Sequence, residues 1–162
     1  MKLDNELTIK RADASDCRDI WQWRNHNEVR KWCFNKNEIP YDQHKAWFDK
    51  NIDNPRILLY VGLTPEGIKV GQVRFDLQEN DESLVNVCVN PELFGKGYGT
   101  KLIDAATRKF MEQQASVGVI VAEIFDDNIA SKKIFTKARY VYDKVVEKEG
   151  LKVNVYLFKR NI

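Results

Sequence analysis

Apolar and polar residues alternate along several short segments of the chain, and this two-residue spacing predicts β-strands. Residues 7–11, Leu-Thr-Ile-Lys-Arg, form the first such segment. Two longer apolar segments, 56–63 and 71–77, flank the turn sequence Thr-Pro-Glu-Gly at 64–67 and therefore predict a hairpin. Further strands are predicted at 83–89, 118–125, 140–146 and 153–159.

Helices are predicted where apolar residues recur every three or four positions. The segment from about 99 to 114 has one apolar face, as in a helix packed on a sheet, and Asn128 can cap another helix through Phe135. The N-terminal part adds a helix capped by Asp13 or Ser15, a short piece around 28–31, and a helix starting at Tyr41.

The predicted order of elements, βααβββαβαββ, gives one mixed sheet with helices on both faces, in the α/β (α+β) class. A length of 162 residues suits one domain with a substantial core, and no repeat or linker divides the sequence. We therefore expect a single domain over residues 1–162.

The charge balance narrows the possible partners. The chain has 26 basic and 24 acidic side chains, which argues against a strongly basic nucleic-acid surface. No apolar run approaches the roughly 20 residues that span a bilayer, and residues 1–6 do not resemble a signal peptide. The three cysteines, Cys17, Cys33 and Cys88, share no short spacing. We expect a cytoplasmic protein without nucleic-acid, membrane or metal binding.

The segment most indicative of ligand binding follows the strand at 83–89, where a proline and a glycine-rich loop lead into a helix. Gly95, Gly97 and Gly99 lie at every second position. Glycine lets backbone N–H groups approach a ligand, and a helix N-terminus offers unpaired donors and a positive dipole end. This arrangement suits a pyrophosphate, although the segment is neither a Walker loop nor a complete GxGxxG motif. The alternative is an ordinary glycine-rich turn.

The loop resembles the acyl-coenzyme A loop of the GNAT N-acetyltransferases, whose pattern is Gln/Arg-x-x-Gly-x-Gly/Ala. Gly97 and Gly99 occupy the two small positions, and Phe94 stands in place of Gln or Arg. The resemblance implies a mostly antiparallel central sheet, acetyl-coenzyme A as cosubstrate and no metal. The implied cosubstrate-binding residues are Val87, Cys88, Val89, Phe94, Gly95, Lys96, Gly97, Tyr98, Gly99, Thr100, Asn128, Ser131 and Phe135.

Residues 122–140 resemble a second segment of the same family, Asn-x-x-Ala/Ser-x-x-Leu-Tyr-x-Lys-x-Gly-Phe. Asn128, Ser131, Ile134 and Lys137 match it, whereas Phe135 replaces the tyrosine that often protonates the coenzyme A thiolate. Arg139 replaces the glycine that usually follows the helix, and Tyr140 matches the aromatic position.

In this family the amine attacks the thioester directly in a ternary complex, so a base is needed but no covalent nucleophile. Glu82 is our first candidate base, among Asp76, Glu79 and Asp81 in the same region, and His44 is an alternative. Tyr140, Tyr142, Tyr98 or water are the candidate acids.

Residues 21–30 and 41–48 resemble acetyltransferases that modify the 4-amino group of UDP-linked amino sugars. The resemblance implies that Arg24, Asn25, Arg30, His44 and Trp47 bind this acceptor, the two arginines holding its diphosphate.

Three other interpretations remain open. The aromatic residues of the acceptor segments can be core residues, and the acceptor can instead be a ribosomal-protein or other protein N-terminus. A module that binds acyl-coenzyme A without catalysis is the alternative of another class. We also expect that an exposed terminal strand could pair across a homodimer.

Overall fold

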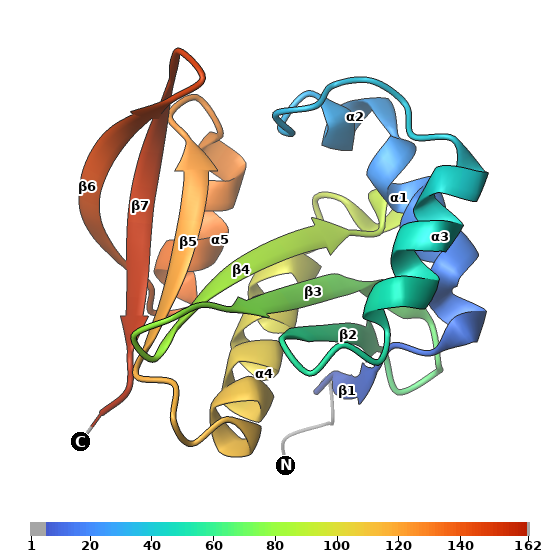
Figure 1. Cartoon of the computed structure of the whole chain (residues 1–162), viewed down its shortest axis with the longest axis horizontal. Helices are drawn as coiled ribbons and strands as arrows, with labels where there is room; N and C mark the ends of the chain where they lie inside the picture. The colour runs from blue at the N-terminus through green and yellow to red at the C-terminus, as the bar shows by residue number, and fades with distance from the viewer. Residues whose placement is uncertain (1–5, 162) are drawn as a thin grey trace.

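One twisted sheet organises the molecule, in a computed structural model that describes residues 6–161 (Figure 1). Its seven strands lie in the order β1-β2-β3-β4-β5-β7-β6. The β4–β5 pair is parallel and the other neighbours are antiparallel, so the predicted mixed, mostly antiparallel sheet is confirmed. The strands are β1 (Thr8–Arg11), β2 (Ile57–Leu63), β3 (Lys69–Leu77), β4 (Glu82–Val89), β5 (Val119–Phe125), β6 (Val141–Lys148) and β7 (Leu151–Lys159).

Helices cover both faces of the sheet, as predicted (Figure 1). The three helical pieces predicted between the first two strands are all present, and the short one, α2, is separate from α1 because His26 is extended and caps the start of α2 with its own ring nitrogen. The helices are α1 (Cys17–Asn25), α2 (Asn27–Arg30), α3 (Tyr41–Asn51), α4 (Tyr98–Gln113) and α5 (Ile129–Lys137), with short 3-10 turns η1 (Ala14–Asp16) and η2 (Pro91–Leu93).

Two apolar cores hold these layers together. On one face α4 packs on the sheet, and the rings of Phe75 and Phe110 stack with centroids 4.1 Å apart. On the other face α1 and α3 contribute Trp23 and Phe48, which pack against Val61 of β2. Alternate residues of each central strand therefore point to different cores, which is the reason for the two-residue spacing in the sequence.

The two edges of the sheet are β1 and β6, whereas the last strand, β7, lies between β5 and β6. Pairing of a terminal strand across a homodimer would therefore use β1, and it stays a prediction. The edge strand β6 carries a bulge between Tyr142 and Lys144, and bulges and lysines are common obstacles to edge pairing.

The two central strands separate along part of their length. β4 and β5 are paired only from Glu82↔Val119 to Val85↔Ala122. Beyond that point β4 continues along β3 as far as Val89, while β5 continues along β7 as far as Phe125. Figure 1 shows the resulting wedge between the two parts of the sheet. None of the helices within residues 6–161 is both long and apolar enough to cross a membrane.

Candidate active site

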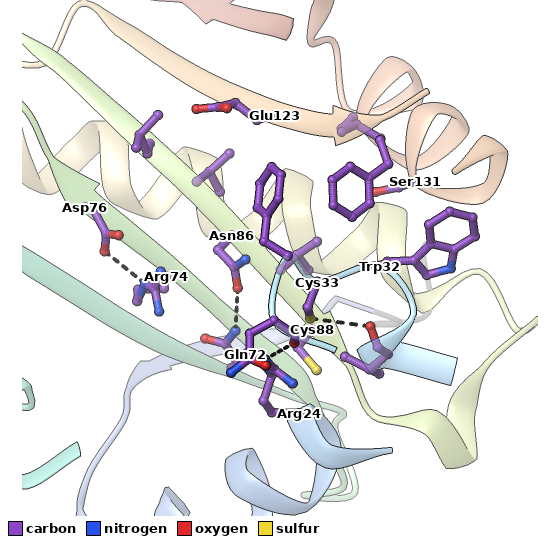
Figure 2. Close-up of a pocket in the computed structure, with 18 of the residues that line it drawn as sticks. Arg24, Trp32, Cys33, Gln72, Arg74, Asp76, Asn86, Cys88, Glu123 and Ser131 are labelled. Atoms are coloured by element: carbon purple, nitrogen blue, oxygen red, sulfur yellow. Dashed lines mark hydrogen bonds and ion pairs between the residues drawn. The ribbon is translucent and has the colours of Figure 1, made fainter. Parts of the chain in front are cut away.

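A cavity of about 680 Å³ lies where β4 and β5 separate (Figure 2). It is open to α5 on one side and to α1, α3 and the loop 31–39 on the other, so it joins the two regions that the sequence predicts to bind ligands. The strand residues that line it on the α1–α3 side are Gln72, Arg74 and Asp76 of β3, Leu84, Asn86 and Cys88 of β4, and Val121, Glu123 and Phe125 of β5.

The sheet register arranges these side chains in rows. Arg74 is opposite Asn86, and Gln72 is opposite Cys88. The Gln72 side-chain amide donates to Asn86 Oδ1 at 3.2 Å. Figure 2 shows Glu123 on β5 across the opening from Asn86 on β4. A reacting group placed in the opening would therefore meet Asn86 on one side and Glu123 on the other.

The glycine loop adopts the conformation that its sequence predicts. Gly95 and Gly97 have φ of +75° and +80°, and a Cβ at either position would meet no atom within 4 Å. Gly97 is the N-cap of α4 and no side chain caps this helix, so its first N–H groups are available to an anion. Gly99 is required for packing instead, because a Cβ there would lie 2.6 Å from Ile134 Cδ1. It allows α4 and α5 to pack closely.

The α5 residues of the second predicted segment reach the same cavity. Asn128 Oδ1 accepts from the Ser131 backbone N–H at 3.1 Å, which caps α5. Asn128, Ser131 and Phe135 all line the cavity, as do Val87 and Cys88 of β4. The rest of the predicted cosubstrate set does not line the cavity: it lies at the end of β4 and around the start of α4.

Two of the three predicted catalytic residues do not reach the cavity. Tyr140 is 1% exposed, and its hydroxyl is 2.7 Å from Thr107 Oγ1 in the core. Burial raises its pKa. Tyr140 is therefore not placed to protonate a leaving group. Glu82 lies at the start of β4, in a shallow surface basin with Glu79, about four residues or 13 Å from Asn86.

Glu123 is the carboxylate that sequence reasoning missed. It faces the opening and its side chain is 23% exposed, with Lys148 Nζ 2.5 Å from Oε2. The signal was present in the sequence, because Glu123 is the one charged residue within the apolar segment 118–125. A nearly continuous apolar segment predicts a strand buried on both faces, whereas one face of β5 opens to the cavity.

His44 lies in the cavity wall, as expected for a ligand-binding residue. Its Nε2 is 3.0 Å from the Cys17 carbonyl, so Nε2 donates and neutral His44 has an unprotonated Nδ1. Burial lowers the pKa of the imidazole, and the hydrogen bond to Cys17 only partly opposes this. Trp47 stands beside it with ring centroids 6.2 Å apart.

The predicted acceptor residues of α1 and α2 mainly hold the loop 31–39. The Asn25 amide donates to the Ile39 carbonyl at 2.8 Å and accepts from its N–H at 2.9 Å. Arg30 donates to the carbonyls of Asn25 and Lys36 at 3.0 and 3.2 Å. Neither side chain is among the residues that line the cavity, and their contact with an acceptor stays a prediction.

Arg24 differs from its neighbours because it does line the cavity. Its Nη2 donates to the Asn35 carbonyl at 2.9 Å, whereas Nη1 is buried without a hydrogen-bond partner in the described chain. Figure 2 shows the guanidinium beside Gln72 and Cys88. This is the unsatisfied donor that a ligand anion would pair.

The loop 31–39 crosses the opening and supplies residues that the sequence did not single out. Phe34 contacts Phe125 of β5 edge to face, with centroids 4.9 Å apart. Trp32 and Cys33 of the same loop line the cavity. The loop therefore bridges the α1–α2 region and β5 above the point where the strands part.

The cavity offers neither a thiol nucleophile nor a metal site. Burial raises the pKa of Cys88 to about 12, so its thiol is not ionised near neutral pH. Within the described residues no group of three or more His, Cys, Asp or Glu side chains is placed to hold a metal ion. The titratable acid–base groups that line the cavity include Asp76, Glu123 and His44.

A family model described as "Acetyltransferase (GNAT) domain" matches residues 6–141. A search of curated proteins gives no significant match. Among solved structures, spermidine N-acetyltransferase from Vibrio cholerae, in complex with coenzyme A and spermine, superposes with a TM-score of 0.84 at 15% identity, covering 96% of both chains. Aminoglycoside acetyltransferase AAC(6')-Ib, in complex with coenzyme A and kanamycin, gives 0.81 at 14% identity, covering 96% of this chain and 95% of the other.

A domain from Methanocaldococcus jannaschii is similar to the same extent, with a TM-score of 0.80 at 19% identity, covering 97% of this chain and all of the other. At these identities the structural similarity shows the fold, not the acceptor. It confirms the architecture expected from the two sequence segments. The named enzymes act outside the nucleotide-sugar and ribosomal-protein branches that the sequence resembles.

The environment of His44 predicts a pH dependence of stability. Its pKa is lowered on folding from about 6.5, so the unfolded chain binds more protons than the folded chain as the pH falls. Stability from this group is therefore complete above about pH 6.5 and is lost as the pH falls through its lower folded pKa. Between pH 7.5 and pH 5.5 the free energy of unfolding, measured with urea, should therefore fall less in His44→Gln than in the wild type.

The matched control is His26→Gln, since His26 is exposed and is the only other histidine. It should leave the pH dependence of the wild type nearly intact. Equal pH dependence in all three proteins would show that burial of His44 has no energetic consequence.

Proposed function

The chain belongs to the GNAT acetyltransferase family, and on that premise we propose that it transfers an acetyl group from acetyl-coenzyme A to the primary amine of a nucleotide-linked amino sugar. The observation that carries the reaction is the opening between β4 and β5. Beyond Val85 and Ala122 the facing edges of β4 and β5 do not pair with each other, and these edges lie beside a cavity that reaches both α5 and the α1–α3 side.

The residues around α4 fit the cosubstrate. A pyrophosphate needs several N–H donors and no side chain in its way, and the start of α4 supplies both at Gly95 and Gly97. The opening beside Asn128 and Ser131 has the position required for an extended arm between the two strands. Phe135 gives that arm an apolar wall.

The proposed reaction proceeds by direct attack. The amine nitrogen forms a bond to the thioester carbonyl carbon, the carbon–sulfur bond breaks, and the sulfur leaves with the electron pair. Glu123 faces the opening and takes the proton that the amine loses. An unpaired backbone N–H of residues 86–89 is available to the carbonyl oxygen.

No protein acid is required to complete the step. Phe135 has no proton to donate, and Tyr140 is bonded to Thr107 in the core. The coenzyme A thiolate is a fairly good leaving group and can take its proton from water. This accounts for the absence of the usual tyrosine from the second sequence segment.

The charge of the cavity supports an acceptor that carries an anion. Two ion pairs, Arg74–Asp76 and Lys148–Glu123, balance internally, and Arg24 remains with a buried, unpartnered Nη1. A cavity of about 680 Å³ has room for a nucleotide sugar, and Trp47 and Trp32 offer faces for a base or sugar ring. Because nucleotide sugars and acetyl-coenzyme A are cytoplasmic metabolites, we place the reaction in the cytoplasm.

Release of the coenzyme A thiol from acetyl-coenzyme A tests the proposal. The acceptors are UDP-linked 4-amino-4,6-dideoxy sugars, spermidine, kanamycin and N-terminal peptides of ribosomal proteins. We expect turnover with the UDP-linked sugars and little with the polycations. Turnover only with peptides would identify a protein N-terminus as the acceptor. Binding of acetyl-coenzyme A without any turnover would favour a non-catalytic module.

The role of Glu123 predicts a selective loss of rate. Glu123→Gln should lower kcat by about 100-fold or more, because the amide cannot accept the proton, while the KM for acetyl-coenzyme A changes little. The matched control is Glu82→Gln, at the surface basin, which should keep nearly the wild-type rate. A larger loss from Glu82→Gln than from Glu123→Gln would restore Glu82 as the base.

The glycine loop predicts a selective loss of binding. Gly97→Glu places a carboxylate at the start of α4, where the pyrophosphate is expected, and should weaken acetyl-coenzyme A binding in calorimetry by at least about tenfold. Gly67→Glu is the control, since Gly67 has φ of +86° and equally open space but lies in the β2–β3 turn. If both variants bind as the wild type does, the pyrophosphate is not held at this loop.

A further inference from the structure

We propose that Arg74 selects the acceptor, its guanidinium being fixed as a fork that binds a phosphate group of the amine substrate. The inference rests on the proposed acetyl transfer and adds to it a specificity residue that the sequence did not indicate. Arg74 points from β3 into the cavity, as Figure 2 shows.

Two neighbours hold the guanidinium in place. Nε lies 2.9 Å from Asp76 Oδ1 as an ion pair, and these two buried atoms are not aligned for a hydrogen bond. The centre of the guanidinium is 5.4 Å from the centroid of the Trp47 ring, within the range of a cation–π contact. A long side chain that would otherwise sample many rotamers is therefore oriented before any ligand arrives, which lowers the entropic cost of binding.

The outer edge of the guanidinium is left free. Neither Nη atom of Arg74 has a hydrogen-bond acceptor within residues 6–161, and the side chain is 31% exposed. Lys148 is paired with Glu123, and Arg24 donates through Nη2 to Asn35 while its unpartnered Nη1 is buried, so Arg74 is the arginine whose Nη groups face the open part of the cavity. The two Nη groups of an oriented arginine match the oxygens of a phosphate.

The position of Arg74 sets the distance between anion and amine. Arg74 is on β3 and Glu123 is on β5, with β4 and the opening between them. Two strand spacings amount to about 10 Å, and the separation of β4 and β5 makes the span no shorter. A sugar with its amine on one side of the ring and a phosphate ester on the other can reach both groups.

The same fork disfavours polycations. A second ammonium group in this part of the cavity would face Arg74 and the buried, unpartnered Nη1 of Arg24. Such repulsion is an effective way to exclude a wrong substrate. The fold is shared with enzymes whose structures contain spermine and kanamycin, so the proposal predicts that Arg74 makes this chain discriminate against such polycations.

The test compares acceptors that differ only in phosphate. UDP-linked 4-amino sugar, the corresponding sugar 1-phosphate and the free amino sugar are assayed with the wild type, Arg74→Gln and Arg74→Lys. Arg74→Gln should raise the KM of the phosphorylated acceptors by about 10- to 100-fold and leave the KM of acetyl-coenzyme A unchanged. Arg74→Lys should restore the KM only in part, because an ammonium group cannot offer two parallel N–H donors to one phosphate group.

Two controls make the result specific. Arg108→Gln removes an exposed arginine of α4 and should change no acceptor KM. The free amino sugar should be a poor substrate whose kcat/KM does not depend on residue 74. Equal losses for the free and phosphorylated acceptors, or an increased KM for acetyl-coenzyme A, would overturn the proposal. A response to the sugar 1-phosphate as large as that to the UDP-linked sugar would show that one phosphate is enough.

A binding measurement separates this inference from the proposed function. UDP alone, titrated calorimetrically, should bind the wild type at least about tenfold more tightly than Arg74→Gln, whether or not any acceptor turns over. Absence of turnover with Arg74-dependent UDP binding would overturn the proposed reaction but keep the anion site. Turnover with Arg74-independent UDP binding would overturn the anion site but keep the reaction.

Discussion

The separation of β4 from β5 is the constraint on which the rest of the structure depends. Each strand stays paired with its other neighbour: β4 with β3 as far as Val89, and β5 with β7 as far as Phe125. The opening therefore removes backbone hydrogen bonds on only one side of each strand. An unpaired backbone group buried without a partner costs about 1–3 kcal/mol. A ligand that bonds to these groups recovers this free energy, and the opening therefore favours an extended, amide-bearing molecule between the strands.

The elements around the opening are placed so that it cannot close. Gly99 brings α4 and α5 together on one face, with Ile134 filling the space that a side chain would need. On the other face the contact of Phe34 with Phe125 bridges the loop 31–39 and β5. The loop in turn depends on Asn25 and Arg30, whose polar atoms are bonded to its backbone. These contacts link both sides of the opening to the helices and to the loop 31–39.

The sequence allowed the fold and the glycine loop to be predicted because both depend on local order. The alternation of apolar and polar residues indicates the strands. Gly95 and Gly97 can form an anion-binding loop only when they follow a strand and precede a helix, and both neighbours are visible in the local sequence. Glu123 and Arg74 escaped notice because each acts through contacts with residues distant in the chain, Lys148 and Trp47. Nothing in the spacing of a single strand indicates which of its two faces lines a cavity.

The segment after α1 shows a different limit of sequence reasoning. Arginine and asparagine next to tryptophan indicated a polar binding surface, yet Asn25 and Arg30 use their donors on main-chain carbonyls of the neighbouring loop. Polar residues that fix a loop and polar residues that bind a ligand have the same composition, and only the partner distinguishes them. Arg24 illustrates both uses in one side chain, since Nη2 is bonded to Asn35 while Nη1 is buried without a partner in the cavity. Under the proposed function, therefore, the half of the site built from α4, α5 and the separated strands carries the reaction, and the charges of α1, β3 and β5 select the amine.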